Sequence, residues 1–289
     1  MIAVTGATGW LGRAVLARLV AEDRPFTAFA SRPRDLVLDG GAPIAVRALT
    51  DLPSTPHDKL VHFAFLTREH AAVHGTEAYV AANLRITALV LDAIARHRPA
   101  VAYASSGAVY AADRSLATDL DANPYGTLKH LDELALRRAA ADAGRSTAVA
   151  RVFNVAGPHI VKPRGFALSD LILQAREHDE LEIRAGHPVL RSYVDVDDLA
   201  ALLLALLEAR EDAVFDTAGD EEVEVGQLAR RIAAQAGRPE LPIRRNADPD
   251  APADRYVGDG TAWAALTRRH GIVPRGLDEQ IARTAAALT

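Results

Sequence analysis

The stretch Thr5-Gly6-Ala7-Thr8-Gly9-Trp10-Leu11-Gly12 lies between an apolar run at residues 2–5 and a helical pattern at residues 12–21. A short apolar run predicts a buried strand, so the stretch is a turn from strand to helix. Its three glycines permit a tight turn, close approach of the backbone to a pyrophosphate and close packing of helix on strand. The start of the helix then offers amide groups and a positive dipole end to phosphate oxygens. We predict a dinucleotide cradle rather than a simple helix cap. Its cofactor contacts are Gly6, Thr8, Gly9, Trp10, Leu11 and Gly12.

The first half of the chain repeats this alternation of short apolar runs and longer helical patterns. Expected strands lie at 2–5, 26–30, 44–47, 60–65, 101–105 and 147–152, and expected helices at 12–21, 76–97 and 125–143. Strands that alternate with helices favour a parallel sheet covered on both faces. The predicted fold class is therefore α/β, with a doubly wound parallel sheet.

The rhythm weakens after Gly157-Pro158, where Pro and Gly become frequent. Residues 193–220 again show the pattern of the first half of the chain, with a helix followed by a strand. We expect a dinucleotide-binding domain of residues 1–156 plus about 193–220. We expect a smaller mixed substrate lobe of about 157–192 plus 221–289.

Composition excludes several classes of function. The 289 residues carry a formal net charge of −5 with acids and bases interspersed, so we expect neither nucleic acid nor a membrane as partner. The chain has no cysteine, which excludes disulfides, thiolate metal sites and a cysteine nucleophile, and we expect no metal. A strand beginning at Ile2 leaves no room for a signal peptide, so a cytoplasmic location is expected.

The end of the second expected strand bears on the choice of dinucleotide. NAD normally takes an acid at this place, whereas an Arg accommodates the 2′-phosphate of NADP. Here the chain has Ser31 and Arg32, with Arg34 nearby and Asp35 only later. Both Ser31 and Arg32 can donate hydrogen bonds to a phosphate. We favour NADP(H) and keep NAD(H) as possible; ordinary solvated loop charges are the alternative interpretation of Arg32 and Arg34.

Tyr125 and Lys129 form a second chemical signal. Asn123 and Pro124 predict a helix start, and residues four apart share one face of a helix. An ammonium and a helix N-terminus both favour a phenolate, so we expect a lowered pKa for Tyr125 and a role in proton transfer. Six Tyr and three Lys give roughly 0.06 chance matches to Tyr-x-x-x-Lys in a chain of this length, so the match carries weight. A surface pair is the alternative.

Ser106 follows the fifth expected strand, and ligands of α/β sheets bind at the carboxyl ends of strands. A serine hydroxyl here, of either Ser105 or Ser106, is expected to hold a substrate carbonyl.

Together these segments resemble the extended short-chain dehydrogenases/reductases, which include epimerases, dehydratases and ketoreductases of nucleotide sugars. The first stretch is similar to the TGxxGxxG motif, residues 105–110 to SSxxVYG, residues 151–158 to RxxNVxGP, and residues 191–200 to R-x-Y-[IV]-x-V-x-D-x-A. The resemblance covers nearly the whole chain and implies a Rossmann sheet and a catalytic set of Ser106, Tyr125 and Lys129. It implies further cofactor contacts at Leu49, Ala64 and Phe65. It implies substrate contacts at Gly107, Asn154, Arg191 and Arg255, where Arg255, Arg244 or Arg245 replaces a family Arg missing near Ala251.

Departures from the family narrow the reaction. The 4,6-dehydratases place Asp-Glu directly after the catalytic Ser/Thr, whereas this chain has Gly107 and Ala108, which cannot exchange a proton. What remains is a ketoreductase acting on a nucleotide-linked 4-keto-6-deoxy sugar or a C4 epimerase, with a non-catalytic NADP-binding protein as a third possibility. In the family, the helices equivalent to 76–97 and 125–143 pair across a two-fold axis, so we expect a homodimer; simple covering of the sheet is the alternative.

Overall fold

The computed structural model describes residues 1–111 and 113–288, which fall into two compact units. Unit 1 comprises Met1–Val152 and Ala200–Phe215, and unit 2 comprises Phe153–Leu199 and Asp216–Thr289. The segment that returns to unit 1 is shorter than the expected 193–220. Tyr193–Asp195 pairs instead with Asn154–Ala156 inside unit 2.

Unit 1 is built on an eight-stranded sheet with the order β12-β7-β6-β5-β1-β2-β4-β3. In chain order the strands are β1 (Ile2–Thr5), β2 (Phe26–Ala30), β3 (Arg34–Leu36), β4 (Ile44–Ala48), β5 (Lys59–His62), β6 (Ala100–Ser106), β7 (Thr147–Val152) and β12 (Ala213–Asp216). Pairing is parallel from β7 across to β4, so these strands end at one edge of the sheet. This confirms the predicted α/β fold with a mostly parallel sheet.

One strand departs from the parallel arrangement. β3 runs antiparallel to β4, with Arg34 opposite Val46 and Leu36 opposite Ile44. Arg34 therefore lies in a short edge strand and not in a loop. No apolar run marks this strand in the sequence, because Arg34 and Asp35 are exposed and only Leu36 is buried.

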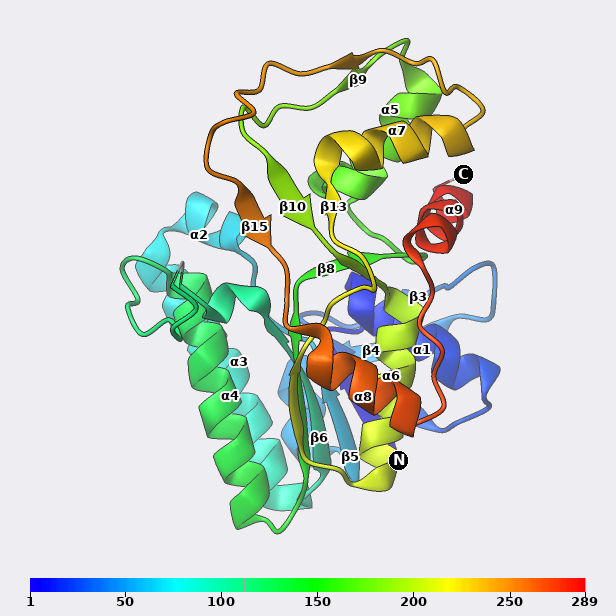
Figure 1. Cartoon of the computed structure of the whole chain (residues 1–289). Coiled ribbons are helices and arrows are strands. Elements are labelled where there is room, and N and C mark those ends of the chain that lie inside the picture. The colour runs from blue at the N-terminus through cyan, green and yellow to red at the C-terminus, as the bar shows by residue number, and fades with distance from the viewer. Residues whose placement is uncertain (112, 289) are drawn as a thin grey trace. The chain divides into compact units, whose positions relative to one another are not determined.

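Helices cover both faces of this sheet. The helices of unit 1 are α1 (Trp10–Ala21), α2 (Arg68–His74), α3 (Thr76–His97), α4 (Pro124–Asp142) and the part of α6 (Val196–Ala209) from Ala200 onward, with the 3-10 turns η1 (Leu49–Ser54) and η2 (Gly107–Val109); α2 has no buried residue and packs on α3 instead of the sheet. Figure 1 shows α3 and α4 side by side on one side of the sheet and α1 on the other. A core between sheet and helices includes Phe29, Tyr103, Ile94 and Leu136, all fully buried.

The buried face of α3 includes polar as well as apolar residues. Tyr79, Asn83, Thr87 and Ile94 are buried, whereas Leu84 is 48% exposed. α3 is also long and apolar enough to cross a membrane by length and composition, although one such helix is weak evidence for a span. Leu84 of α3 thus remains outside the core.

Unit 2 combines small sheets with helices around a core of its own. Its strands are β8 (Asn154–Ala156), β9 (Leu181–Glu182), β10 (Val189–Arg191), β11 (Tyr193–Asp195), β13 (Val223–Glu224), β14 (Ile243–Arg244) and β15 (Asp254–Tyr256). Its helices are η3 (Pro163–Gly165), α5 (Ala167–Glu177), the first part of α6, α7 (Val225–Gln235), α8 (Gly260–Arg269) and α9 (Leu277–Ala287). β10 pairs antiparallel with β13 and parallel with β15, a mixed pattern.

Candidate active site

The glycine turn between β1 and α1 has the shape of a phosphate cradle. Gly6 has a φ of +67°, and a Cβ built on it would lie 2.6 Å from the Phe63 carbonyl carbon. A Cβ on Gly12 would collide with the carbonyl oxygen of Gly6. No side chain caps α1 at Gly9, which leaves this N-terminus suited to an anion. These residues therefore fit a dinucleotide pyrophosphate.

The other predicted cofactor contacts follow the neighbouring strands of the same edge. Ser31 and Arg32 are exposed directly after β2, Leu49 is buried after β4, and Ala64 and Phe65 follow β5. Within the described part of the chain, Arg32 is exposed and forms no ion pair, so its guanidinium can bind an anion. Buried Asn83 fixes the loop after β5, because its Oδ1 accepts a hydrogen bond from the Leu66 amide at 2.8 Å.

The start of α4 is locked onto the end of β6. Asn123 caps α4 by accepting from the Gly126 amide at 2.9 Å, and its Nδ2 donates to the Ala108 carbonyl at 2.9 Å. A Cβ on Gly126 would collide with that carbonyl oxygen, so glycine is needed for the close approach. This contact brings Tyr125 beside Ser106 and Gly107.

The Tyr125 phenol lies within hydrogen-bonding reach of the Ser106 side chain. Burial raises the pKa of Tyr125, against the lowering expected from its lysine neighbour. The Ser106 hydrogen bond and the positive charge of Arg68 act in the opposite direction and lower that pKa. The phenol is therefore a protonated donor near neutral pH.

Lys129 points into unit 1 and not into solvent. Its side chain is buried, and its Nζ donates to the Ala104 carbonyl oxygen at 2.8 Å. The ammonium lies 4.0 Å from the centroid of the Phe65 ring and 4.7 Å from that of Tyr103. Burial lowers the pKa of Lys129 to about 8, although the charges of Asp132 and Glu133 raise it. Lys129 is thus mostly an ammonium at neutral pH.

Arg68 is a member of this group that sequence reasoning missed. Its guanidinium carbon lies 5.1 Å from the centroid of the Tyr125 ring, and Phe65 meets the same ring edge-on at 5.7 Å. Arg68 begins α2, only a few residues after β5. Its place soon after a strand end was the one sequence feature that could have suggested a role in the site, because no motif spacing links Arg68 to Tyr125.

The predicted substrate contacts in unit 2 already have protein partners. Arg191 pairs with Asp254 at 2.7 Å, and Arg255 pairs with Glu222 at 2.7 Å. Asn154 donates from Nδ2 to the carbonyls of Ser192 and Tyr256 at 3.0 and 3.1 Å. A substrate phosphate at either arginine would have to compete with a carboxylate. Arg244 and Arg245, the other candidates, pair with Glu180 and Glu224.

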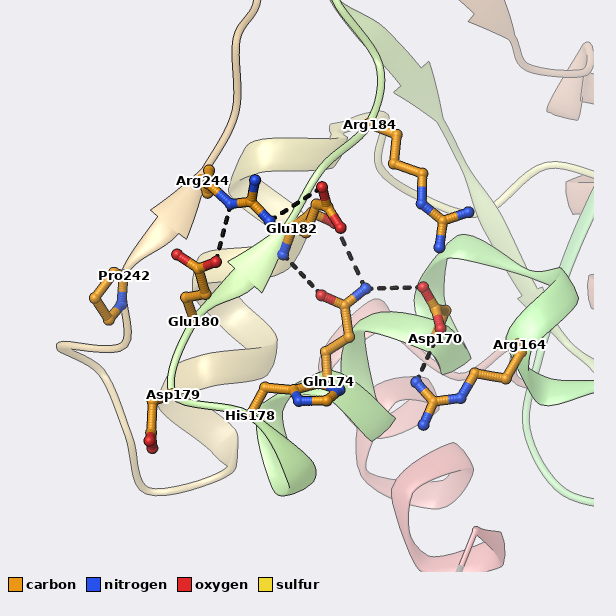
Figure 2. Close-up of a pocket in the computed structure, with 10 residues that line it drawn as sticks. All are labelled: Arg164, Asp170, Gln174, His178, Asp179, Glu180, Glu182, Arg184, Pro242 and Arg244. Carbon is orange, nitrogen blue, oxygen red and sulfur yellow. Dashed lines mark hydrogen bonds and ion pairs between the residues drawn. The ribbon is translucent and has the colours of Figure 1, made fainter.

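Unit 2 also has an open cavity of about 630 Å³, shown in Figure 2. Its charges are largely paired with one another: Arg164 with Asp170, and Arg244 with Glu180 and Glu182. Apart from Arg244, it contains none of the predicted site residues. We assign it no role in catalysis.

A glycine cradle at the carboxyl edge of a parallel sheet, with a Ser, a Tyr and a buried Lys beside it, defines a Rossmann-type dinucleotide-binding protein of the short-chain dehydrogenase/reductase class. The family model of the NAD dependent epimerase/dehydratase family matches residues 2–218. The chain belongs to that family.

Two curated relatives match part of the chain. The chain is 31% identical over 153 residues to a dTDP-4-dehydro-6-deoxy-D-allose reductase of Streptomyces bikiniensis, a match that covers 52% of this chain and 45% of the relative. It is 30% identical over 94 residues to UDP-glucuronic acid decarboxylase 1 of Xenopus tropicalis, covering 32% and 22%. The matched stretches span at most about half the length of these relatives.

Solved structures support the fold over the whole chain. The structure of MoeE5 in complex with UDP-glucose and NAD has a TM-score of 0.77 at 24% identity, covering 99% of this chain and 98% of that one. A UDP-glucose 4-epimerase of Thermotoga maritima, with UDP-glucose, has a TM-score of 0.76 at 20% identity, covering 99% and 98%.

Proposed function

We propose that this protein is an NADP(H)-dependent ketoreductase that acts on a nucleotide-linked 4-keto-6-deoxy sugar. The observation that carries the proposal is the placement of Ser106, Tyr125 and Lys129 at the sheet edge that also bears the glycine cradle. The relative named as a dTDP-4-dehydro-6-deoxy-D-allose reductase supports this choice of substrate.

The site residues suggest how the reduction proceeds. The glycine turn at residues 5–12 would hold the reduced dinucleotide, which would supply a hydride for the carbonyl carbon when bound. Ser106 and Tyr125 hold the carbonyl oxygen by hydrogen bonds, and Tyr125 donates its phenolic proton as negative charge develops there. The positive charges of Lys129 and Arg68 stabilise the phenolate left behind. Hydride and proton together convert the ketone into an alcohol.

Ser31 and Arg32 favour NADP(H) as cofactor. Both are exposed after β2, where a 2′-phosphate can accept their hydrogen bonds. MoeE5, which shares the fold, forms a complex with NAD, and this keeps NAD(H) as the alternative cofactor.

A C4 epimerase with tightly bound NAD is the second candidate, favoured by the fold likeness to a UDP-glucose 4-epimerase. A purified sample mixed with NADPH and a 4-keto-6-deoxy nucleotide sugar separates the possibilities. Loss of NADPH absorbance supports the reductase. Interconversion of sugars without net cofactor change supports the epimerase. Cofactor binding without turnover of either kind leaves only a non-catalytic dinucleotide-binding protein.

We also propose a homodimer formed through α3 and α4. Leu84 on α3 and Leu131 and Leu134 on α4 are 48%, 44% and 51% exposed, and the two helices pack together. Exposed apolar side chains of this size are typical of an interface. Light scattering on the purified protein tests this. Leu84→Glu with Leu134→Glu is expected to give monomers, and a monomeric wild type contradicts the proposal.

A further inference from the structure

Two oppositely charged side chains are buried in α4 without a direct ion pair. Lys129 is 4% exposed and Asp132 is 3% exposed. Neither has an ion-pair contact within 4.0 Å among the residues that the structure describes. Buried charges normally need a partner, so the arrangement calls for a reason.

Glu133, the other acid near Lys129, already has a partner of opposite charge. Glu133 is 2% exposed and is held by Arg151 through hydrogen bonds of 2.7 and 3.0 Å. Arg151 also donates to the Tyr110 hydroxyl at 2.6 Å. Asp132 is therefore the uncompensated carboxylate next to Lys129.

Two hydroxyl groups donate hydrogen bonds to the carboxyl group of Asp132. Thr87 of α3 donates to Oδ1 at 2.7 Å, and Tyr103 of β6 donates to Oδ2 at 3.2 Å. The ring of Tyr103 also lies against the Lys129 ammonium, so one side chain touches both charges. Burial raises the pKa of Asp132 above its ordinary value, although Thr87, Lys129 and Tyr103 act in the opposite direction.

We propose that Asp132 is a positioning residue, whose buried carboxylate is the counter-charge that keeps Lys129 as an ammonium one helical turn after Tyr125. Its role in turnover rests on the proposed function, but the charge relationship does not. Thr87 and Tyr103 fix the carboxylate, and the Tyr103 and Phe65 rings hold the ammonium in place.

The other titratable or charged groups around Lys129 do not replace Asp132. His62 of β5 is stacked on Tyr103, and its burial and the charge of Lys129 lower its pKa to about 3, so it is neutral. Burial raises the pKa values of Tyr103 and Tyr125, so both are uncharged. Glu133 is paired with Arg151, and Arg68 carries the same sign as Lys129.

Lysine NMR tests the proposal without any turnover. The chain has only Lys59, Lys129 and Lys162, so a Lys129→Arg variant assigns the signal. We expect Lys129 to titrate near pH 8 in the native protein. In Asp132→Asn, Oδ1 can still accept from Thr87, and Nδ2 would donate to the Tyr103 hydroxyl. The midpoint should fall by at least about one pH unit, because Lys129 loses the charge of Asp132 while its own burial is unchanged. Asp132→Glu should restore part of the change.

Asp142→Asn, an exposed acid on the same helix, serves as the matched control and should leave the midpoint unchanged. If Asp132→Asn does not fold, Thr87→Val, which removes one hydrogen bond to the carboxylate, should lower the midpoint by less. An unchanged Lys129 midpoint in either folded variant overturns the proposal. In turnover assays the alkaline limb of kcat should move with the midpoint while KM stays constant. Absence of turnover in the wild type would refute the proposed function and leave the NMR result to decide Asp132.

Discussion

The Lys129 ammonium donates a hydrogen bond to the carbonyl oxygen of Ala104, with 2.8 Å between the two atoms. This bond turns the lysine inward, toward the end of β6 where Ser106 and Tyr125 meet. The candidate catalytic lysine is therefore part of the folded core of unit 1 and not a mobile surface cation. Its low exposure makes its charge sensitive to the groups around it.

The choice of cofactor can be tested at the end of β2. Arg32→Ala should weaken NADPH binding by about tenfold or more, because a 2′-phosphate loses a charged hydrogen-bond donor, and should leave NADH binding unchanged. Arg34→Ala in edge strand β3 is the control. Fluorescence titration measures both cofactors. Equal loss of affinity for NADPH and NADH would argue against NADP(H) as the preferred cofactor.

The glycine cradle should not tolerate a side chain at Gly12. In Gly12→Ala the new Cβ meets the Gly6 carbonyl, so we expect destabilisation of about 1–3 kcal/mol and at least about tenfold weaker cofactor binding. Gly276→Ala is the control, because its nearest neighbour would be 3.9 Å away. Urea denaturation and NADPH titration measure the two effects. Native affinity in Gly12→Ala would show that α1 does not approach the phosphates.

Breaking the buried ion pair of Glu133 and Arg151 should lower the stability of the protein strongly. Glu133→Gln leaves the guanidinium without its carboxylate in a site where Glu133 is 2% exposed, so we expect a loss of about 3–5 kcal/mol in the free energy of unfolding. The exposed pair of Arg138 and Asp142 on the same helix provides the comparison, and Asp142→Asn should change stability little. A similar effect of the two substitutions would contradict the importance of burial.

His62 should make the protein acid-sensitive. Its Nδ1 lies 2.7 Å from the Thr5 hydroxyl, and burial lowers its pKa to about 3, against 6.5 unfolded. Between these values the unfolded chain binds more protons, so stability falls as pH falls from 6.5 toward 3, by up to about 1.4 kcal/mol per pH unit.

In His62→Asn the amide can keep the Thr5 bond, and the pH dependence of unfolding over this range should become shallower. The exposed His74 provides the control substitution His74→Asn. Urea denaturation at several pH values measures the free energy of unfolding. If this free energy changes with pH equally in wild type and His62→Asn, His62 is not the source of the acid sensitivity.

Much of the fold followed from local patterns. β1, β2, β7 and α3 have the predicted bounds, because apolar runs and helical periods are properties of adjacent residues. β3 was missed because only Leu36 of its three residues is buried. In α3, Leu84 is exposed although Thr87 and Ile94 on the same face are buried, and polar Asn83 points inward to bind the loop after β5.

Less of the candidate site than of the fold could be predicted from the sequence. The Tyr125 and Lys129 spacing and the Ser106 position were visible, because a helix and a strand end fix them. Arg68 and Asp132 were not, since their roles depend on α2 meeting Tyr125 and on α3 meeting α4. Burial of Tyr125 was equally hidden, which explains why the expected lowering of its pKa differs from the structure.

In the proposed reaction Tyr125 delivers the proton to the substrate carbonyl, and Tyr125→Phe tests this role most directly. Single-turnover reduction of a 4-keto-6-deoxy nucleotide sugar by NADPH should slow by about 100- to 10,000-fold in this variant, with NADPH affinity unchanged. A rate within about threefold of wild type would contradict the proposed role, because the phenol would then contribute nothing to the transition state.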